Sequence, residues 1–219
     1  MGTSSYLLKI FRLLYPLPEP PQARTKELQI LCLGLPRSGT DSLRQALLRL
    51  GYHKVAHGFD WWIDNPGISY LYAELALLRS QGRLPEAETL RMSYFDRTLG
   101  EYEATTDVPG AWFPEELLQA YPDAKVILNK RRDVASWKAS FRESVLPILE
   151  SWRYWFFSWF EPELFWAEWI TLELHGRELL RGNFERHAEQ AHLEHYERLE
   201  RALDRDGRPF LAWSVEDGW

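Results

Sequence analysis

The sequence predicts an α/β fold of three layers, with helices on both faces of a central parallel sheet. Short apolar runs at 28–33, 124–129 and 209–214 have the length and composition of buried strands. Segments with helical spacing of apolar residues separate these runs, and strands that alternate with helices are typical of a parallel sheet. The 219 residues are enough for one large domain with a substantial core.

The composition excludes several classes of protein. The net charge of −6 is the opposite of what a general nucleic-acid binder carries, so we expect no nucleic-acid partner. The single cysteine, Cys32, excludes an intrachain disulfide framework and a cysteine-rich zinc site, and it fits a reducing compartment. No run reaches the roughly 18 apolar residues that span a bilayer. We therefore expect a cytoplasmic protein without a transmembrane segment.

The first 25 residues read as an accessory segment. Residues 6–17 (YLLKIFRLLYPL) carry Lys9 and Arg12 among apolar residues, which predicts an amphipathic helix that docks on the domain or on a membrane surface. The proline-rich stretch 16–25 (PLPEPPQART) predicts an extended linker. We accordingly expect a helix and linker over 1–25 and one α/β domain over 26–219.

The elements between the strands follow from spacing and from helix stop signals. After the first strand, Leu43, Leu47 and Leu50 recur at helical spacing, and Gly51 ends that helix. Residues 53–60 form a connection, and residues 105–109 form a loop or the end of a strand. Further helices are expected at 70–100 with breaks near Gly82 and Pro85, at 114–120, at 134–141 and over 172–204.

A glycine-bracketed loop, LGLPRSGTDSL at 33–43, joins the first strand to the first helix of the domain. Backbone N–H groups and the helix dipole make such a loop an anion cradle, although a plain strand-to-helix turn is the alternative. Gly34 and Gly39 have the spacing of the nucleoside-triphosphatase loop, but Thr40 and Asp41 replace its lysine and its magnesium-binding hydroxyl. The loop is therefore suited to phosphate but not to ATP or GTP hydrolysis. The residues that we place around the phosphate are Pro36, Arg37, Ser38, Gly39, Thr40, Asp41 and Ser42.

A second cluster of cations follows the strand at 124–129. Lys130, Arg131 and Arg132 end this strand, and Ser140 lies two turns into the next helix. Arginine binds phosphate in a bidentate way, so Arg132 and Ser140 can converge on one anion. The alternative is a solvated basic turn with ion pairs to neighbouring acids. Both anion sites lie at the carboxyl ends of strands, where open α/β sheets bind their ligands.

These two motifs, in this order, resemble the P-loop sulfotransferases that use 3′-phosphoadenosine 5′-phosphosulfate (PAPS). The family pattern is a loop P-[KR]-[ST]-G-T after a strand and a later strand that ends R-D-x…S, which PRSGT at 36–40 and KVILNKRRDVASWKAS at 125–140 match here. The chain looks closest to the fungal sulfotransferase-like branch, and the resemblance covers residues 28–145 well. It implies the P-loop, nucleoside-triphosphatase-like form of the three-layer fold.

The resemblance also implies roles for individual residues. Arg37 and its loop neighbours match the segment that holds the 5′-phosphosulfate, and Arg37 would neutralise the departing phosphate. Arg132 and Ser140 match the pair that holds the 3′-phosphate. No metal is implied, and adenosine 3′,5′-bisphosphate would be the product.

The chain departs from the family at the catalytic base. Many relatives carry a histidine in a T-H-x-P segment, and here Asp107 takes its place in TDVP at 106–109. A carboxylate serves as a general base if its pKa suits the task, since nearby cations lower that pKa and burial raises it. A turn residue is the alternative reading of Asp107. His57 is a second candidate for the base or for a substrate contact. The alternative is that His57 has a purely structural role. Asp60 is a weaker candidate than Asp107 or His57.

Two other groups of residues have several interpretations. The aromatic block 151–170 reads first as core, and otherwise as an acceptor pocket, a homodimer surface or a membrane-contact patch. On the pocket interpretation, Trp152, Trp155 and Phe156 would contact the acceptor. His187, His192 and His195 lie among Glu and Arg residues, which predicts a solvated helix face rather than a metal site.

We therefore expect an enzyme that moves a sulfuryl group from PAPS to a hydroxyl of an apolar small molecule. The alternatives are a catalytically degenerate relative that binds a nucleotide or a protein partner, and a P-loop kinase or NTPase. Many relatives also carry a later Gly- and Lys-rich loop over the adenine. No such loop precedes the end of the chain at SVEDGW, so we expect either a chain truncated at its C-terminus or a family end that is missing.

Overall fold

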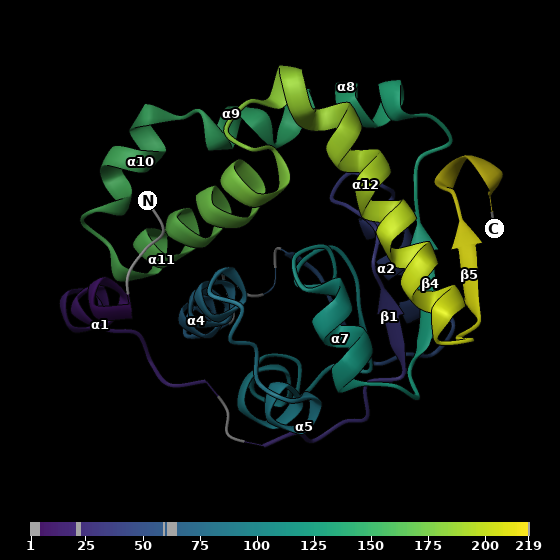
Figure 1. The fold of residues 1–219 in the computed structure, drawn as a ribbon, viewed down its shortest axis with the longest axis horizontal. Coiled ribbons are helices and arrows are strands. Elements are labelled where there is room, and N and C mark those ends of the chain that lie inside the picture. Colours follow the sequence, from purple (N-terminus) through teal and green to yellow (C-terminus); the bar gives the residue numbers. More distant parts are fainter. Residues whose placement is uncertain (1–4, 21–22, 59, 61–64, 219) are drawn as a thin grey trace.

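The computed structural model describes residues 5–20, 23–58, 60 and 65–218. Within these ranges five strands form one sheet in the order β2-β3-β1-β4-β5, and every neighbouring pair is parallel. The fold is thus the predicted α/β architecture with a central parallel sheet between helices (Figure 1). The strands are β1 (Ile30–Cys32), β2 (Val55–Ala56), β3 (Ala104–Thr105), β4 (Lys125–Asn129) and β5 (Phe210–Trp213).

The helical elements connect the strands and extend the core away from the sheet. They are α1 (Ser5–Leu14), α2 (Thr40–Arg49), α4 (Ile68–Ser80), α5 (Ala87–Leu90), η1 (Arg91–Phe95), α6 (Asp96–Thr98), α7 (Pro114–Ala120), α8 (Val134–Ser144), α9 (Leu146–Leu149), α10 (Trp152–Ser158), α11 (Pro162–Thr171), η2 (Leu172–Leu179), α12 (Phe184–Arg205) and η3 (Val215–Asp217).

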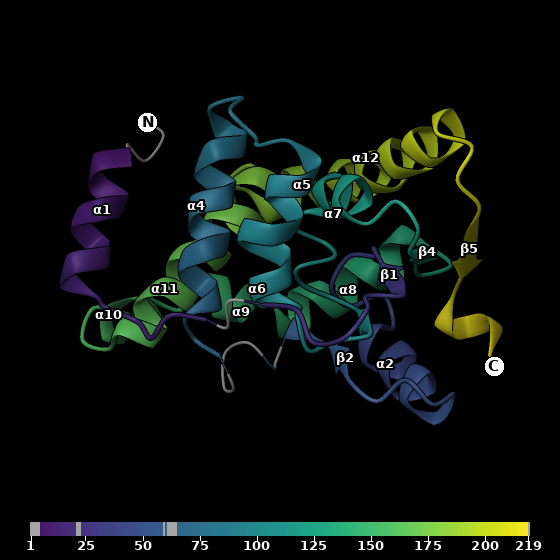
Figure 2. The ribbon, with the colours of Figure 1, turned by 90° about the horizontal axis from the view of Figure 1, so that it is seen from below.

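Alternation of side chains along the strands builds the two packing layers. Successive residues of a strand point to opposite faces of the sheet. In β1, Ile30 and Cys32 pack with Leu43 and Leu47 of α2 on one face. Leu31 points to the other face and joins the main core, which also includes α4, α7, α11 and α12. Figure 2 shows α2 on one side of the sheet and α7 with α12 on the other.

The predicted elements agree with the structure where the sequence pattern is long. The strands expected at 28–33, 124–129 and 209–214 correspond to β1, β4 and β5, and the helix expected at 114–120 is α7. The helical stretch 70–100 is broken after α4, as expected from Gly82 and Pro85. Strand β2 lies in the predicted connection 53–60 and was not anticipated, because two residues carry no periodicity. Strand β3 begins one residue before the expected strand end at 105–109.

The prediction of a solvated histidine face on α12 is wrong for two of the three histidines. His192 and His195 are 5% and 3% exposed. The Nε2 atom of His195 hydrogen bonds the carbonyl oxygen of Leu33 at 2.8 Å, and the ring of His192 packs on Trp137. Burial lowers the pKa of both histidines to about 4, so both are neutral at pH 7. The many Glu and Arg residues around them concealed the buried stripe of this helix.

Helix α1 packs against α4 and α11 through a narrow contact. Leu8 is buried, and the ring of Tyr15 stacks on Phe165 with 3.8 Å between centroids. Trp166 donates its indole N–H to the carbonyl of Tyr15 at 2.8 Å. The predicted amphipathic helix is thus present, while residues 1–4 and 21–22 of the expected accessory segment lie outside the described residues. No helix among the described residues is both long and apolar enough to cross a membrane.

Candidate functional site

The glycine-bracketed loop leaves the carboxyl end of β1 and leads into the N-terminus of α2. Gly39 precedes the helix with φ of 75°, a left-handed conformation that glycine adopts at little cost. Arg37 also has a positive φ of 71°. Such backbone conformations in a non-glycine residue cluster at binding sites, where the surrounding structure holds them. The loop therefore has the local geometry of an anion cradle at a helix N-terminus.

Three side chains from distant parts of the chain hold this loop. Asn129, at the end of β4, accepts the N–H of Gly34 through Oδ1 at 3.1 Å and donates from Nδ2 to the carbonyl of Ser38 at 3.2 Å. Trp137 donates its indole N–H to the carbonyl of Pro36 at 2.9 Å. These contacts fix both ends of the loop before any ligand binds. Neither Asn129 nor Trp137 was among the predicted site residues, although a polar residue at the end of an apolar strand is a usable signal.

Tyr196 of α12 is the third support, and it also escaped the sequence analysis. Its hydroxyl accepts the N–H of Leu35 at 3.2 Å, donates to the carbonyl of Asn129 at 2.8 Å and hydrogen bonds the hydroxyl of Ser38 at 3.0 Å. Ser38 is fully buried. Its side chain, predicted to contact the phosphate, therefore supports the loop in this structure.

A cavity of about 540 Å³ opens beside the loop. Among the described residues, its loop end is lined by six of the seven residues predicted to surround the phosphate, Ser38 being the exception. His57, Asp107 and Arg131 line the same cavity. The structure thus brings the predicted phosphate loop and both candidate bases into one space. The loop residues in the lining are Pro36, Arg37, Gly39, Thr40, Asp41 and Ser42.

Thr40, His57 and Asp107 form a chain of polar contacts at the floor of this cavity. The hydroxyl of Thr40 lies 3.2 Å from Nε2 of His57, and Nδ1 of His57 lies 3.8 Å from Oδ2 of Asp107. Asp60 accepts the backbone N–H of His57 at 3.0 Å and pairs with Arg44 at 2.9 Å. Asp60 therefore positions the histidine and does not line the main cavity.

Burial raises the pKa of Asp107 above its ordinary value. The proximity of His57 and hydrogen bonds from the backbone N–H groups of Val108 and Gly58 oppose this rise. A carboxylate with a raised pKa is a stronger base than one in water, and Asp107 keeps access to the cavity with 14% of its side chain exposed. Asp107 thus has the environment that a general base requires.

The second predicted anion site adjoins the loop, but its two residues have different partners. Arg37 donates from Nε to the hydroxyl of Ser140 at 3.1 Å, and Arg131 donates from Nε to the carbonyl of Arg37 at 3.0 Å. Arg132 is exposed and pairs with Asp217 at 3.0 Å. Glu216 pairs with Arg131 at 2.9 Å. The two basic segments are therefore neighbours, and Arg131 contacts the loop where the sequence analysis had emphasised Arg132.

The predicted acceptor contacts lie outside the cavity lining. Trp152, Trp155 and Phe156 of α10 are 69%, 49% and 45% exposed. The apolar wall of the cavity comes instead from residues just before α10, including Val145 and Ile148. The block 151–170 divides accordingly, since the aromatic residues of α10 are largely exposed while α11 buries Phe165 and Trp166 in the core.

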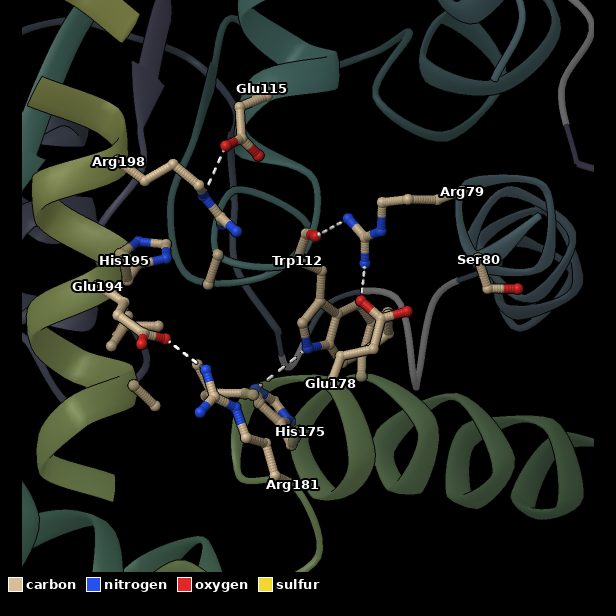
Figure 3. Close-up of a pocket in the computed structure, with 15 residues that line it drawn as sticks. Arg79, Ser80, Trp112, Glu115, His175, Glu178, Arg181, Glu194, His195 and Arg198 are labelled. Atoms are coloured by element: carbon tan, nitrogen blue, oxygen red, sulfur yellow. Dashed lines mark hydrogen bonds and ion pairs between the residues drawn. The ribbon is translucent and has the colours of Figure 1, made fainter. Parts of the chain in front are cut away.

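A second cavity of about 440 Å³ shares Trp112 and His175 with the first. Trp112 donates its indole N–H to Nε2 of His175 at 3.1 Å (Figure 3). The wall of this second cavity carries arginines that are paired with glutamates, so its charges balance. The pairs are Arg79 with Glu178, Arg181 with Glu194 and Arg198 with Glu115. In the described part of the chain, no group of three or more His, Cys, Asp or Glu side chains could hold a metal ion.

Comparison with known proteins decides the family. Residues 29–219 match the sulfotransferase domain. The chain belongs to this sulfotransferase family. A further relative, named Ava biosynthesis cluster protein M, from Aspergillus versicolor, is 33% identical over 200 residues, which are 88% of this chain and 73% of that protein. The family and this fungal relative agree with the resemblance that the loop and the second basic segment indicated.

Proposed function

We propose that this sulfotransferase-family protein moves a sulfuryl group from PAPS to a hydroxyl of an apolar small molecule and releases adenosine 3′,5′-bisphosphate. The observation that carries the proposal is the shared cavity, in which the phosphate loop and the Asp107–His57 pair face the same space. Val145 and Ile148 supply the apolar wall that such an acceptor requires. A relative that is named for a biosynthesis cluster supports a small-molecule acceptor.

The anion end of the cavity is suited to the donor's 5′-phosphosulfate. Arg37 and the N-terminus of α2 supply positive potential, and Arg131 adds a second guanidinium at the cavity wall. As the bond between sulfur and the bridging phosphate oxygen breaks, negative charge grows on the departing phosphate. Donors that are already held in place stabilise that charge without reorganisation during the reaction.

On the acceptor side of the reacting sulfur, opposite the departing phosphate, Asp107 takes the acceptor proton. Its carboxylate removes the proton of the acceptor hydroxyl while that oxygen forms the new bond to sulfur. His57 lies between Asp107 and Thr40, so it holds the carboxylate in place and links it to the loop. The proton thus ends on Asp107, and the bonding electrons of the broken S–O bond end on the phosphate.

Activity is expected to rise with pH through the pKa of Asp107. Protonated Asp107 cannot accept the acceptor proton, and burial places its pKa above the ordinary value of about 3.9. The acid limb of the kcat profile should therefore lie above pH 4, and it should disappear in Asp107→Asn. A wild-type rate that stays constant down to pH 4 would contradict this role.

Arg132 is assigned to the 3′-phosphate. Its replacement by alanine should weaken the binding of adenosine 3′,5′-bisphosphate by at least about tenfold, because a charged hydrogen bond contributes roughly 1.5–3 kcal/mol. The binding of adenosine 5′-monophosphate should not change. Calorimetry with both nucleotides measures this difference. Arg142→Ala is the matched control, since Arg142 is exposed and pairs with Glu185 outside the cavity lining. Equal losses for both nucleotides would remove Arg132 from the 3′-phosphate site.

The proposed activity is tested by incubating the purified chain with PAPS and a panel of phenols and alcohols. Mass spectrometry should detect a product 80 Da heavier than one of the acceptors, as sulfuryl addition requires, together with adenosine 3′,5′-bisphosphate. Omission of the acceptor should stop release of the bisphosphate. A panel that yields no product while the chain still binds the nucleotide would contradict catalysis.

A non-catalytic nucleotide-binding protein is the second candidate function. The pairing of Arg131 with Glu216 and of Arg132 with Asp217 favours it over catalysis, because these carboxylates compete with the donor's phosphates for both guanidinium groups and so oppose the placement of PAPS for transfer. On this reading, adenosine 3′,5′-bisphosphate binds and Asp107→Asn changes nothing that can be measured.

A further inference from the structure

Three buried polar side chains follow one another on the helix formed by α11 and η2. Glu168, Thr171 and His175 are 3%, 6% and 6% exposed. Within the part of the chain that the structure describes, Glu168 Oε2, Thr171 Oγ1 and His175 Nδ1 have no hydrogen-bond partner. Buried polar atoms in native proteins nearly always have one. Three such atoms within two turns therefore point to a ligand or solvent molecule that provides their missing hydrogen-bond partners.

Two of these residues face the cavity of the phosphate loop. Thr171 and His175 both line it, whereas the loop and Asp107 reach it from other elements. Their neighbours in the lining include Val145 and Ile148, which are apolar. Thr171 and His175 thus belong to the same lining as these apolar residues, together with Ser144.

The tautomer of His175 follows from its contact with Trp112. An indole N–H only donates, so Nε2 of His175 must accept it and carries no proton (Figure 3). Burial lowers the pKa of His175 to about 4, so the ring is neutral at pH 7. The single ring proton therefore sits on Nδ1, which makes this unpartnered atom a hydrogen-bond donor.

We propose that Thr171 and His175 form a subsite for a second, uncharged oxygen of the acceptor, a carbonyl or hydroxyl remote from the hydroxyl that reacts. His175 donates from Nδ1, and the hydroxyl of Thr171 donates or accepts beside it. Both groups are neutral, and the cations of the cavity, Arg37 and Arg131, belong to the loop end. The subsite therefore selects an uncharged oxygen over an anionic one. This inference rests on the proposed function, because the ligand of the subsite is the acceptor of the proposed sulfuryl transfer.

The test compares matched ligands in binding experiments. The probes are p-alkylphenols and the same phenols with a keto group at successive positions of the alkyl chain, titrated into the full chain in the presence of adenosine 3′,5′-bisphosphate. One keto phenol should bind about 5–10-fold more tightly than its parent, the gain expected from a buried hydrogen bond. Thr171→Val and His175→Phe should abolish this preference and leave the affinity of the parent phenol within about twofold.

Thr105→Val is the matched control, because the hydroxyl of Thr105 is also buried and unpartnered within the described residues but lies in strand β3. It should keep the wild-type preference. Thr171→Val tests the subsite even if His175→Phe fails to fold. The absence of any keto preference in the wild type, or an equal preference in all variants, would overturn the subsite and leave ordered water as the partner.

Nucleotide binding separates this proposal from the proposed function. If the phenols are titrated without nucleotide and the keto preference still depends on Thr171, the subsite stands even when adenosine 3′,5′-bisphosphate does not bind. If the bisphosphate binds and PAPS is turned over while no keto phenol is preferred, the proposed function stands and the subsite is refuted.

Discussion

Asp107→Asn is expected to lower kcat by about 10²–10⁴-fold, the usual contribution of a general base. Asparagine has the same shape and can still accept a backbone N–H, but it cannot take a proton from the acceptor. The affinity for adenosine 3′,5′-bisphosphate should stay within about twofold, because Asp107 contacts His57 and the backbone of Gly58 and Val108. Steady-state kinetics and calorimetry on the same preparation measure the two effects separately.

The control for this variant is Asp123→Asn, which changes an exposed carboxylate in the turn before β4 and should leave kcat unchanged. If Asp107→Asn retains more than half of the wild-type kcat, Asp107 is not the base. A His57→Gln variant then separates the remaining possibilities, since it alone should lose the rate if the histidine takes the proton directly.

Gly34→Ala should cost about 3 kcal/mol of stability, at the upper end of what overpacking costs. A Cβ atom on residue 34 would lie 1.9 Å from the backbone oxygen of Asn129 and 2.4 Å from its Nδ2 atom. Neither can move aside, because the oxygen belongs to β4 and the amide holds the loop. For a domain of this size the melting temperature should fall by roughly 6–12 °C, as measured by calorimetry or circular dichroism.

Gly176→Ala is the matched control, since a Cβ atom there meets no atom within 4 Å. Its melting temperature should equal that of the wild type or exceed it slightly, because alanine favours a helix over glycine. If both variants lose the same stability, the close approach of the loop to Asn129 is not what requires glycine at position 34.

The sequence located the loop and its strand because both signals are local. Glycine spacing, a short apolar run and the next leucine-rich helix lie within about 20 residues, so one window contains them all. Asp107 and His57 were also identifiable as candidates. That these two side chains lie close together could not be predicted. Their proximity depends on the pairing of β2 with β3, and a two-residue strand has no recognisable sequence pattern.

The supports of the loop could not be predicted for a different reason. Tyr196 is 161 positions from Leu35, to which it bonds, and it lies in a helix whose composition is dominated by Glu and Arg. The helical periodicity of buried residues in α12 is present, but Ala188, His192 and His195 are not the aliphatic residues by which such a stripe is recognised. The residues that line the cavity were therefore easier to predict from the sequence than those that hold the loop in place.

Calorimetry with adenosine 3′,5′-bisphosphate and with ATP–magnesium tests the central claim most directly. One bisphosphate should bind per chain, Arg37→Ala should weaken it by at least about tenfold through loss of a charged contact, and ATP–magnesium should bind weakly or not at all. Tighter binding of ATP–magnesium, or bisphosphate binding that is indifferent to Arg37, would contradict the assignment of this loop and cavity to a sulfuryl donor.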